Sequence, residues 1–119
     1  MKHRTLITLV VAAALGAAIW FVSPWITGQQ EPWDGDVTYY FAALIVTGLI
    51  AGVASPKPAW AHYAGNFIGQ LGCELFLIKV GPLVLIGVGF LLVSSLIYLA
   101  AAVAGAKLKK LLGEHKKLP

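Results

Sequence analysis

Four apolar stretches, each close to the length that crosses a lipid bilayer, fill most of this 119-residue chain. They cover residues 5–27, 37–54, 59–78 and 83–106. A transmembrane α-helix needs about 20 mostly apolar residues, because each residue advances the helix by about 1.5 Å through a hydrocarbon layer about 30 Å thick. The pattern therefore predicts an all-α integral membrane protein. Residues 1–119 would form one domain, a compact bundle of four transmembrane helices.

The composition supports the membrane class and excludes several others. Hydrophobic residues make up 59% of the chain and charged residues only 12%, whereas soluble domains carry about 25% charged residues. The single cysteine, Cys73, excludes an internal disulfide and a cysteine-rich metal framework. The net charge is +4, but the basic residues lie beside apolar stretches. There they are better explained by the orientation of the helices in the membrane and by contact with anionic lipid than by nucleic-acid binding. We therefore expect a lipid bilayer as the environment, no cofactor and no nucleic-acid partner.

The first apolar stretch, residues 5–27, allows two interpretations. It follows Lys2, His3 and Arg4 and includes an alanine-rich run, as a secretory signal peptide would. The apolar run continues through residues 19–22, beyond the usual core of a signal peptide. We favour a retained helix, and a cleaved signal peptide stays the alternative.

The distribution of Lys and Arg predicts the orientation, because cytoplasmic loops carry an excess of these residues. If the N-terminus is cytoplasmic, eight of the nine basic residues fall inside, while Lys79 and the acidic Glu31, Asp34 and Asp36 fall outside. The eight are Lys2, Arg4, Lys57, Lys107, Lys109, Lys110, Lys116 and Lys117. We therefore expect both termini in the cytoplasm and a basic cytoplasmic tail over residues 107–119. We assign the chain to a bacterial or archaeal cytoplasmic membrane.

The third apolar stretch carries polar side chains along its length. They are His62, Asn66, Gln70, Cys73 and Glu74, and we call them the polar seam. Because an α-helix turns about 100° per residue, these side chains fall within an arc of about 120°. A polar face is costly in hydrocarbon, so the polar seam should face protein or water.

Two interpretations of the polar seam remain open. In the first, the amides of Asn66 and Gln70 hydrogen-bond to neighbouring helices, and the seam serves packing or docks a helix of another protein. In the second, the seam lines a path or a ligand site, because Glu74 and His62 at its two ends suit a proton or a small cation. Glu74 lies five residues from Lys79, so its carboxyl group could also reach the outer interface.

Glycines indicate where helices approach one another closely. Gly48 and Gly52 form a GxxxG pair in the second stretch, and Gly65 and Gly69 lie beside the polar seam in the third. Small residues allow two helix backbones to come together in a membrane. We therefore expect the second and third stretches to pack against each other through these four glycines.

The sequence contains no catalytic constellation and no metal site, so we expect neither an enzyme nor a metalloprotein. His62 and Cys73 share a helix face but stand about 16.5 Å apart along the axis, whereas zinc ligands bind at about 2 Å. We expect a small channel-like or transport-associated protein that moves a proton or a small cation along the polar seam. A bundle this small encloses little space, so the path would form between protomers of a homo-oligomer. The alternative is a non-catalytic accessory or assembly subunit of a larger membrane complex.

Overall fold

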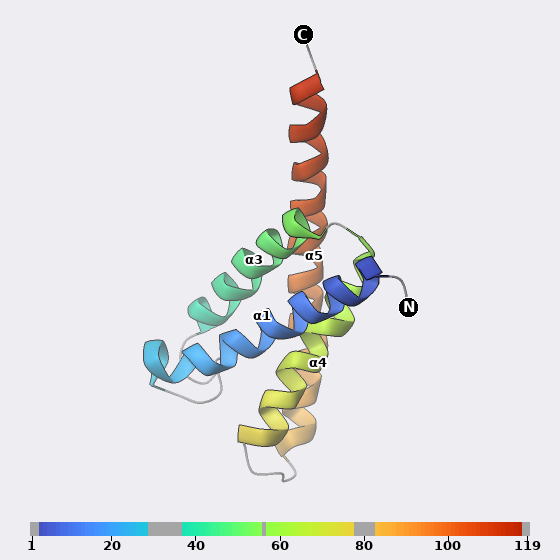
Figure 1. The fold of residues 1–119 in the computed structure, drawn as a ribbon. Helices are drawn as coiled ribbons and strands as arrows, with labels where there is room; N and C mark the ends of the chain where they lie inside the picture. Colours follow the sequence, from blue (N-terminus) through green and yellow to red (C-terminus); the bar gives the residue numbers. More distant parts are fainter. Residues whose placement is uncertain (1–2, 29–36, 56, 78–82, 118–119) are drawn as a thin grey trace.

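The computed structural model describes residues 3–28, 37–55, 57–77 and 83–117, which are almost entirely helical. The helices are α1 (His3–Thr27), α3 (Val37–Ala54), α4 (Ala59–Leu77) and α5 (Leu83–Lys117), as Figure 1 shows. No strand occurs within these ranges. The prediction of an all-α fold is therefore confirmed. The predicted outer-loop acids Glu31, Asp34 and Asp36, and the basic Lys79, lie outside the described residues.

Three of the described helices are long and apolar enough to cross a membrane. They are α1, α3 and the Leu85–Gly113 part of α5. The expected span over residues 59–78 does not join them: α4 forms as a 19-residue helix but is not among the candidate spans. The reason is the polar seam itself, whose imidazole, amide and carboxyl groups lower the mean hydropathy of this helix. The correction leaves three candidate spans and one polar helix packed among them.

The end of α1 follows a local sequence signal. Pro24 lies inside α1, which continues to Thr27. Gly28 then takes a positive φ of 78°, and its backbone N–H donates to the Pro24 carbonyl at 3.1 Å. This left-handed cap suits glycine because it has no side chain to clash.

The fourth helix is longer than predicted, because α5 does not end at Ala106. It continues without a break to Lys117, a total of 35 residues, so residues 107–117 are part of the helix rather than a separate tail. Leu and Lys are good helix formers, and no proline interrupts this segment. Figure 1 shows the C-terminal part of α5 projecting beyond the other helices.

The helices form a ring in which α1 packs on α4, α4 on α5, α5 on α3, and α3 on α1. The α1–α4 pair is parallel: Leu9 lies against Gly65 and Ala13 against Gly69. The α3–α5 pair is parallel as well, because Gly48 lies against Tyr98 and Gly52 against Ala102. Each parallel pair therefore uses one of the two glycine pairs.

This arrangement corrects the expectation that the second and third stretches pack on each other. A Cβ atom on Gly48 would come 2.7 Å from the Ala101 Cβ of α5, and one on Gly65 would come 2.8 Å from the Ala12 Cβ of α1. The helices α3 and α4 share few contacts and face each other across the ring. A GxxxG pattern shows that a helix can be approached closely, but it does not determine which helix approaches.

The bundle has a polar interior and an apolar exterior. The buried polar residues are Thr8, Ser23, Ser55, His62, Asn66, Gln70, Glu74, Ser94 and Ser95. Large apolar side chains are exposed on every described helix, among them Phe21, Ile45, Phe76 and Phe90. A soluble monomer rarely exposes so much contiguous apolar surface, whereas a lipid bilayer would cover it. The distribution supports the membrane class.

Candidate functional site

The polar seam of α4 faces the interior of the bundle. Asn66 and Gln70 are 0% exposed, Glu74 is 2% exposed, and His62 is buried as well. Because so little of their surface is exposed, there is almost no room for a water molecule beside these side chains. The seam is covered by α1, α3 and α5 of the same chain, so in the monomer it faces neither lipid nor a second copy.

Gln70 is the centre of a hydrogen-bond network that joins all four described helices. Its Oε1 accepts from the Trp20 Nε1–H of α1 at 3.2 Å and from the Tyr40 hydroxyl of α3 at 2.6 Å. Its Nε2–H donates to the Asn66 Oδ1 one turn away at 2.7 Å. The Tyr40 hydroxyl oxygen also lies 2.7 Å from the Ser94 Oγ of α5. Buried polar networks of this kind specify a unique packing.

His62 occupies the end of the polar seam near the turn between α3 and α4. Its Nε2 lies 2.7 Å from the Ser55 carbonyl oxygen. Because a carbonyl only accepts, Nε2 carries the hydrogen, and the neutral ring then has an unprotonated Nδ1. This Nδ1 is buried and has no hydrogen-bond partner among the described residues. The ring of Tyr98 lies 6.2 Å from the His62 ring, centroid to centroid.

The Ser55 backbone is held by a second set of polar contacts. The Ser55 hydroxyl is hydrogen-bonded to the Thr8 hydroxyl of α1. The Thr8 Oγ1 also lies 2.9 Å from the Lys57 carbonyl oxygen and 3.0 Å from the Arg4 carbonyl oxygen. The start of α1 and the turn after α3 are thus joined at the same end of the bundle as His62.

Glu74 lies at the other end of the polar seam and is buried rather than at a surface. Its carboxyl group faces α5, where the absence of a side chain at Gly87 leaves room for it. A Cβ atom at Gly87 would collide with the Glu74 Oε1. Within the bundle, the Glu74 side chain is therefore enclosed by protein, with only 2% of its surface exposed.

Cys73 shares the buried face but takes no part in the network around Gln70. Its Sγ lies 3.9 Å from the Ala17 carbonyl oxygen of α1, and the side chain packs in a cluster with Trp20 and Leu91. A buried free cysteine behaves as a small apolar residue. Its place here is in the packing between α1 and α4.

Several buried polar atoms along α4 and α5 lack partners among the described residues. Besides the His62 Nδ1, they include the Asn66 Nδ2, the Ser95 Oγ and the Tyr98 hydroxyl. Leaving such a group unpaired costs about 1–3 kcal/mol, so native interiors contain few of them. Because these unpartnered atoms lie along and beside the polar seam, this part of the core contains more hydrogen-bonding groups than are needed to hold the helices together.

Several members of the polar core were not predicted from the sequence. Trp20 and Tyr40 are aromatic residues near the ends of apolar stretches, a position typical of the membrane interface, yet both are buried and bonded to Gln70. Ser94 and Tyr98 are spaced four residues apart on α5 and are also buried. The repeat of Ser94, Ser95 and Tyr98 at helical spacing was the available signal.

No group of three or more His, Cys, Asp or Glu side chains comes together as a metal site would require within the described part of the chain. The polar core is instead built from hydroxyl, amide, imidazole and carboxyl groups in a line between α4 and its neighbours. Comparisons with protein-family models, with curated proteins and with solved structures gave no match to this chain.

Proposed function

We propose that this protein conducts protons across a membrane through the polar core of a single chain. The observation that carries the proposal is a line of buried polar side chains on α4 that runs from His62 to Glu74. Beside this line, the His62 Nδ1, the Asn66 Nδ2, the Ser95 Oγ and the Tyr98 hydroxyl have no hydrogen-bond partner among the described residues. Twelve residues of helix separate these two side chains, which is about 18 Å at about 1.5 Å per residue. That distance is more than half of a hydrocarbon layer about 30 Å thick.

In this proposal α4 crosses the bilayer as a fourth span. Packing against the neighbouring helices, rather than its own hydropathy, stabilises α4 in the membrane. Its outward side chains are apolar: Trp60, Ile68 and Phe76 are exposed. Its polar side chains are covered by the other helices, so lipid would meet only apolar groups. Arg4, Lys57 and Lys109 line one pocket at the same end of the bundle. This grouping supports cytoplasmic termini.

The packing favours a proton over a hydrated metal cation as the species that moves. A hydrated ion needs space beside the polar seam, whereas Asn66 and Gln70 are 0% exposed. A proton needs only a succession of groups that both donate and accept, with water entering where the packing opens. The basic side chains at the His62 end would also repel metal cations.

The side chains divide into groups that relay protons and groups that position them. Hydroxyls donate and accept, and a histidine can take a proton on one nitrogen and release it from the other. We assign the relay to His62, Tyr98, Tyr40 and Glu74, with the serines of α5 between them. Amides do not exchange protons readily, so Gln70 acts by holding the Tyr40 hydroxyl in place.

This path differs from the one between protomers that the size of the bundle suggested, because it requires no second copy. An accessory subunit, the alternative function, would have to dock through another surface. The polar seam is already covered by the chain's own helices, so we do not assign it to a partner helix.

Proton flux into liposomes tests the proposal. The purified full chain is reconstituted in vesicles that contain a pH-sensitive dye, and a potassium gradient with valinomycin sets the voltage. We expect a voltage-driven pH change that Glu74→Gln largely abolishes and Tyr98→Phe slows, because each removes one relay group. Phe76→Leu, an apolar change on the exposed side of α4, should leave the flux unchanged. The absence of flux in the unaltered protein, or equal flux in Glu74→Gln, would exclude this path.

A further inference from the structure

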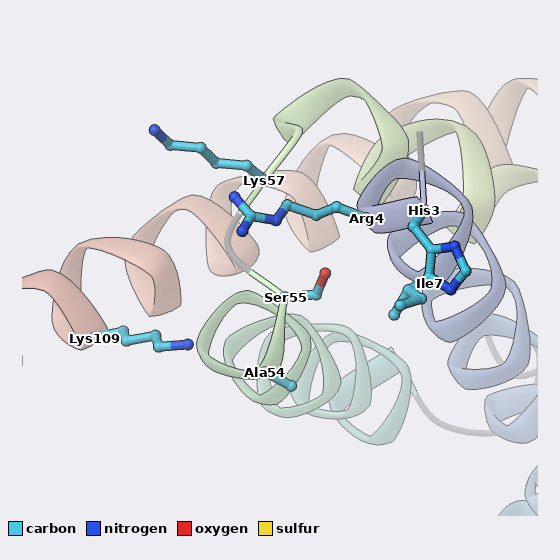
Figure 2. Close-up of a pocket in the computed structure, with 7 residues that line it drawn as sticks. All are labelled: His3, Arg4, Ile7, Ala54, Ser55, Lys57 and Lys109. Atoms are coloured by element: carbon cyan, nitrogen blue, oxygen red, sulfur yellow. The ribbon is translucent and has the colours of Figure 1, made fainter. Parts of the chain in front are cut away.

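A basic cavity lies at the end of the bundle where α1 begins and α3 ends, next to the His62 end of the polar core. Its volume is about 670 Å³. Three segments far apart in the sequence contribute to it: the start of α1, the turn between α3 and α4, and the late part of α5. Figure 2 shows the lining residues, which are His3, Arg4, Ile7, Ala54, Ser55, Lys57 and Lys109.

The cavity concentrates positive charge. Arg4, Lys57 and Lys109 each come from a different segment, and no carboxylate is among the described residues that line it. In Figure 2 the side chains of Arg4 and Lys109 reach into the opening from opposite sides, while Lys57 extends outward from the turn. Like charges held together repel one another, and a bound anion would relieve that repulsion.

The floor of the cavity is ordered by hydrogen bonds that do not depend on a ligand. The buried Ser55 is hydrogen-bonded to Thr8, and the Thr8 Oγ1 lies close to the carbonyl oxygens of Arg4 and Lys57. These contacts hold the backbone at two of the three cationic positions. The cations are thus presented from fixed points of the fold, and their exposed side chains remain able to adjust to an anion.

We propose that this cavity binds the phosphate of an anionic phospholipid headgroup. A guanidinium group suits a phosphate because its donors form two parallel bonds to the phosphate oxygens. The apolar Ile7 lines the same cavity, and the exposed Val10 follows one turn further along α1. Acyl chains could therefore continue from a bound headgroup along this side of α1. Free phosphate offers the same oxygens but would leave the apolar side of the cavity unused.

The experiment measures lipid retained by the full chain, purified in a mild detergent, by native mass spectrometry. Phosphatidylglycerol, phosphatidylcholine and inorganic phosphate are added in separate arms. We expect preferential retention of phosphatidylglycerol, weaker at high salt because ions screen the cations. Equal retention of the two lipids would overturn the proposal, and binding of inorganic phosphate as tight as that of phosphatidylglycerol would assign the site to free anions instead.

Two neighbouring lysines supply a matched pair of variants. Lys109 lines the cavity, whereas Lys110 is the next residue on the same exposed part of α5 and does not line it. Lys109→Gln should lower phosphatidylglycerol retention about fivefold, the effect expected for one cation near an anionic lipid surface. Lys110→Gln should have little effect, and Arg4→Gln should repeat the loss if Lys109→Gln were to disturb α5. Equal losses in the two lysine variants would mean diffuse surface charge rather than a site.

Discussion

Two glycines on the same helix give the sharpest test of the packing. Gly69 and Gly72 both lie in α4, but an added Cβ atom has opposite surroundings at the two positions. At Gly69 it would collide with the Ala13 carbonyl group of α1 and come 2.8 Å from the Ala13 Cα. At Gly72 it would meet nothing within 4 Å. The variants Gly69→Ala and Gly72→Ala therefore differ in whether the added methyl group collides with α1.

The expected magnitude follows from two opposing effects. Replacing glycine by alanine in a helix stabilises it by about 0.5–1 kcal/mol, and this gain is shared by both variants. Overpacking costs about 1–3 kcal/mol and applies only at Gly69, where the backbone of α1 must move away. The shared gain cancels in the comparison, so Gly69→Ala should be less stable than Gly72→Ala by about 1–3 kcal/mol.

Unfolding of both variants in mixed detergent micelles, followed by circular dichroism during titration with sodium dodecyl sulfate, measures this difference. A larger residue at the same place, Gly69→Leu, should impair folding further, because its side chain cannot fit between the two helices. Equal unfolding free energies for the two alanine variants would refute the close approach of α1 and α4.

Two further predictions concern the hydrogen-bond network and the aromatic residues. Gln70→Leu removes the acceptor for Trp20 and Tyr40 and the donor to Asn66. Hydrogen bonds in membrane proteins average about 0.6 kcal/mol each, so the loss of these three should lower the unfolding free energy by about 2 kcal/mol. An unchanged unfolding free energy would contradict the network. Trp20 is 0% exposed and Trp25 is 89% exposed, so brominated lipids should quench the fluorescence of a variant that retains only Trp25 far more strongly than one that retains only Trp20. Equal quenching of the two would show that Trp20 lies at the surface.

The sequence by itself determined the features of this protein that depend on short-range rules. Apolar runs of sufficient length form helices that satisfy their own backbone hydrogen bonds, which is why the bounds predicted at 37–54 agree with α3. The common face of His62, Asn66, Gln70 and Glu74 follows from the turn of the helix alone. These properties depend only on residues close together in the sequence and not on how the helices pack.

Only the tertiary structure decided which surfaces meet. The glycine pairs revealed close contacts but not their partners. Trp20 and Tyr40 lie within apolar stretches, and such a stretch looks the same whether the aromatic ring faces lipid or protein. Likewise, Arg4, Lys57 and Lys109 lie in three separate segments until the helices bring them to one cavity. The physical reason is that pairing depends on the complementary shapes of whole helix faces, which residues distant in the sequence build together.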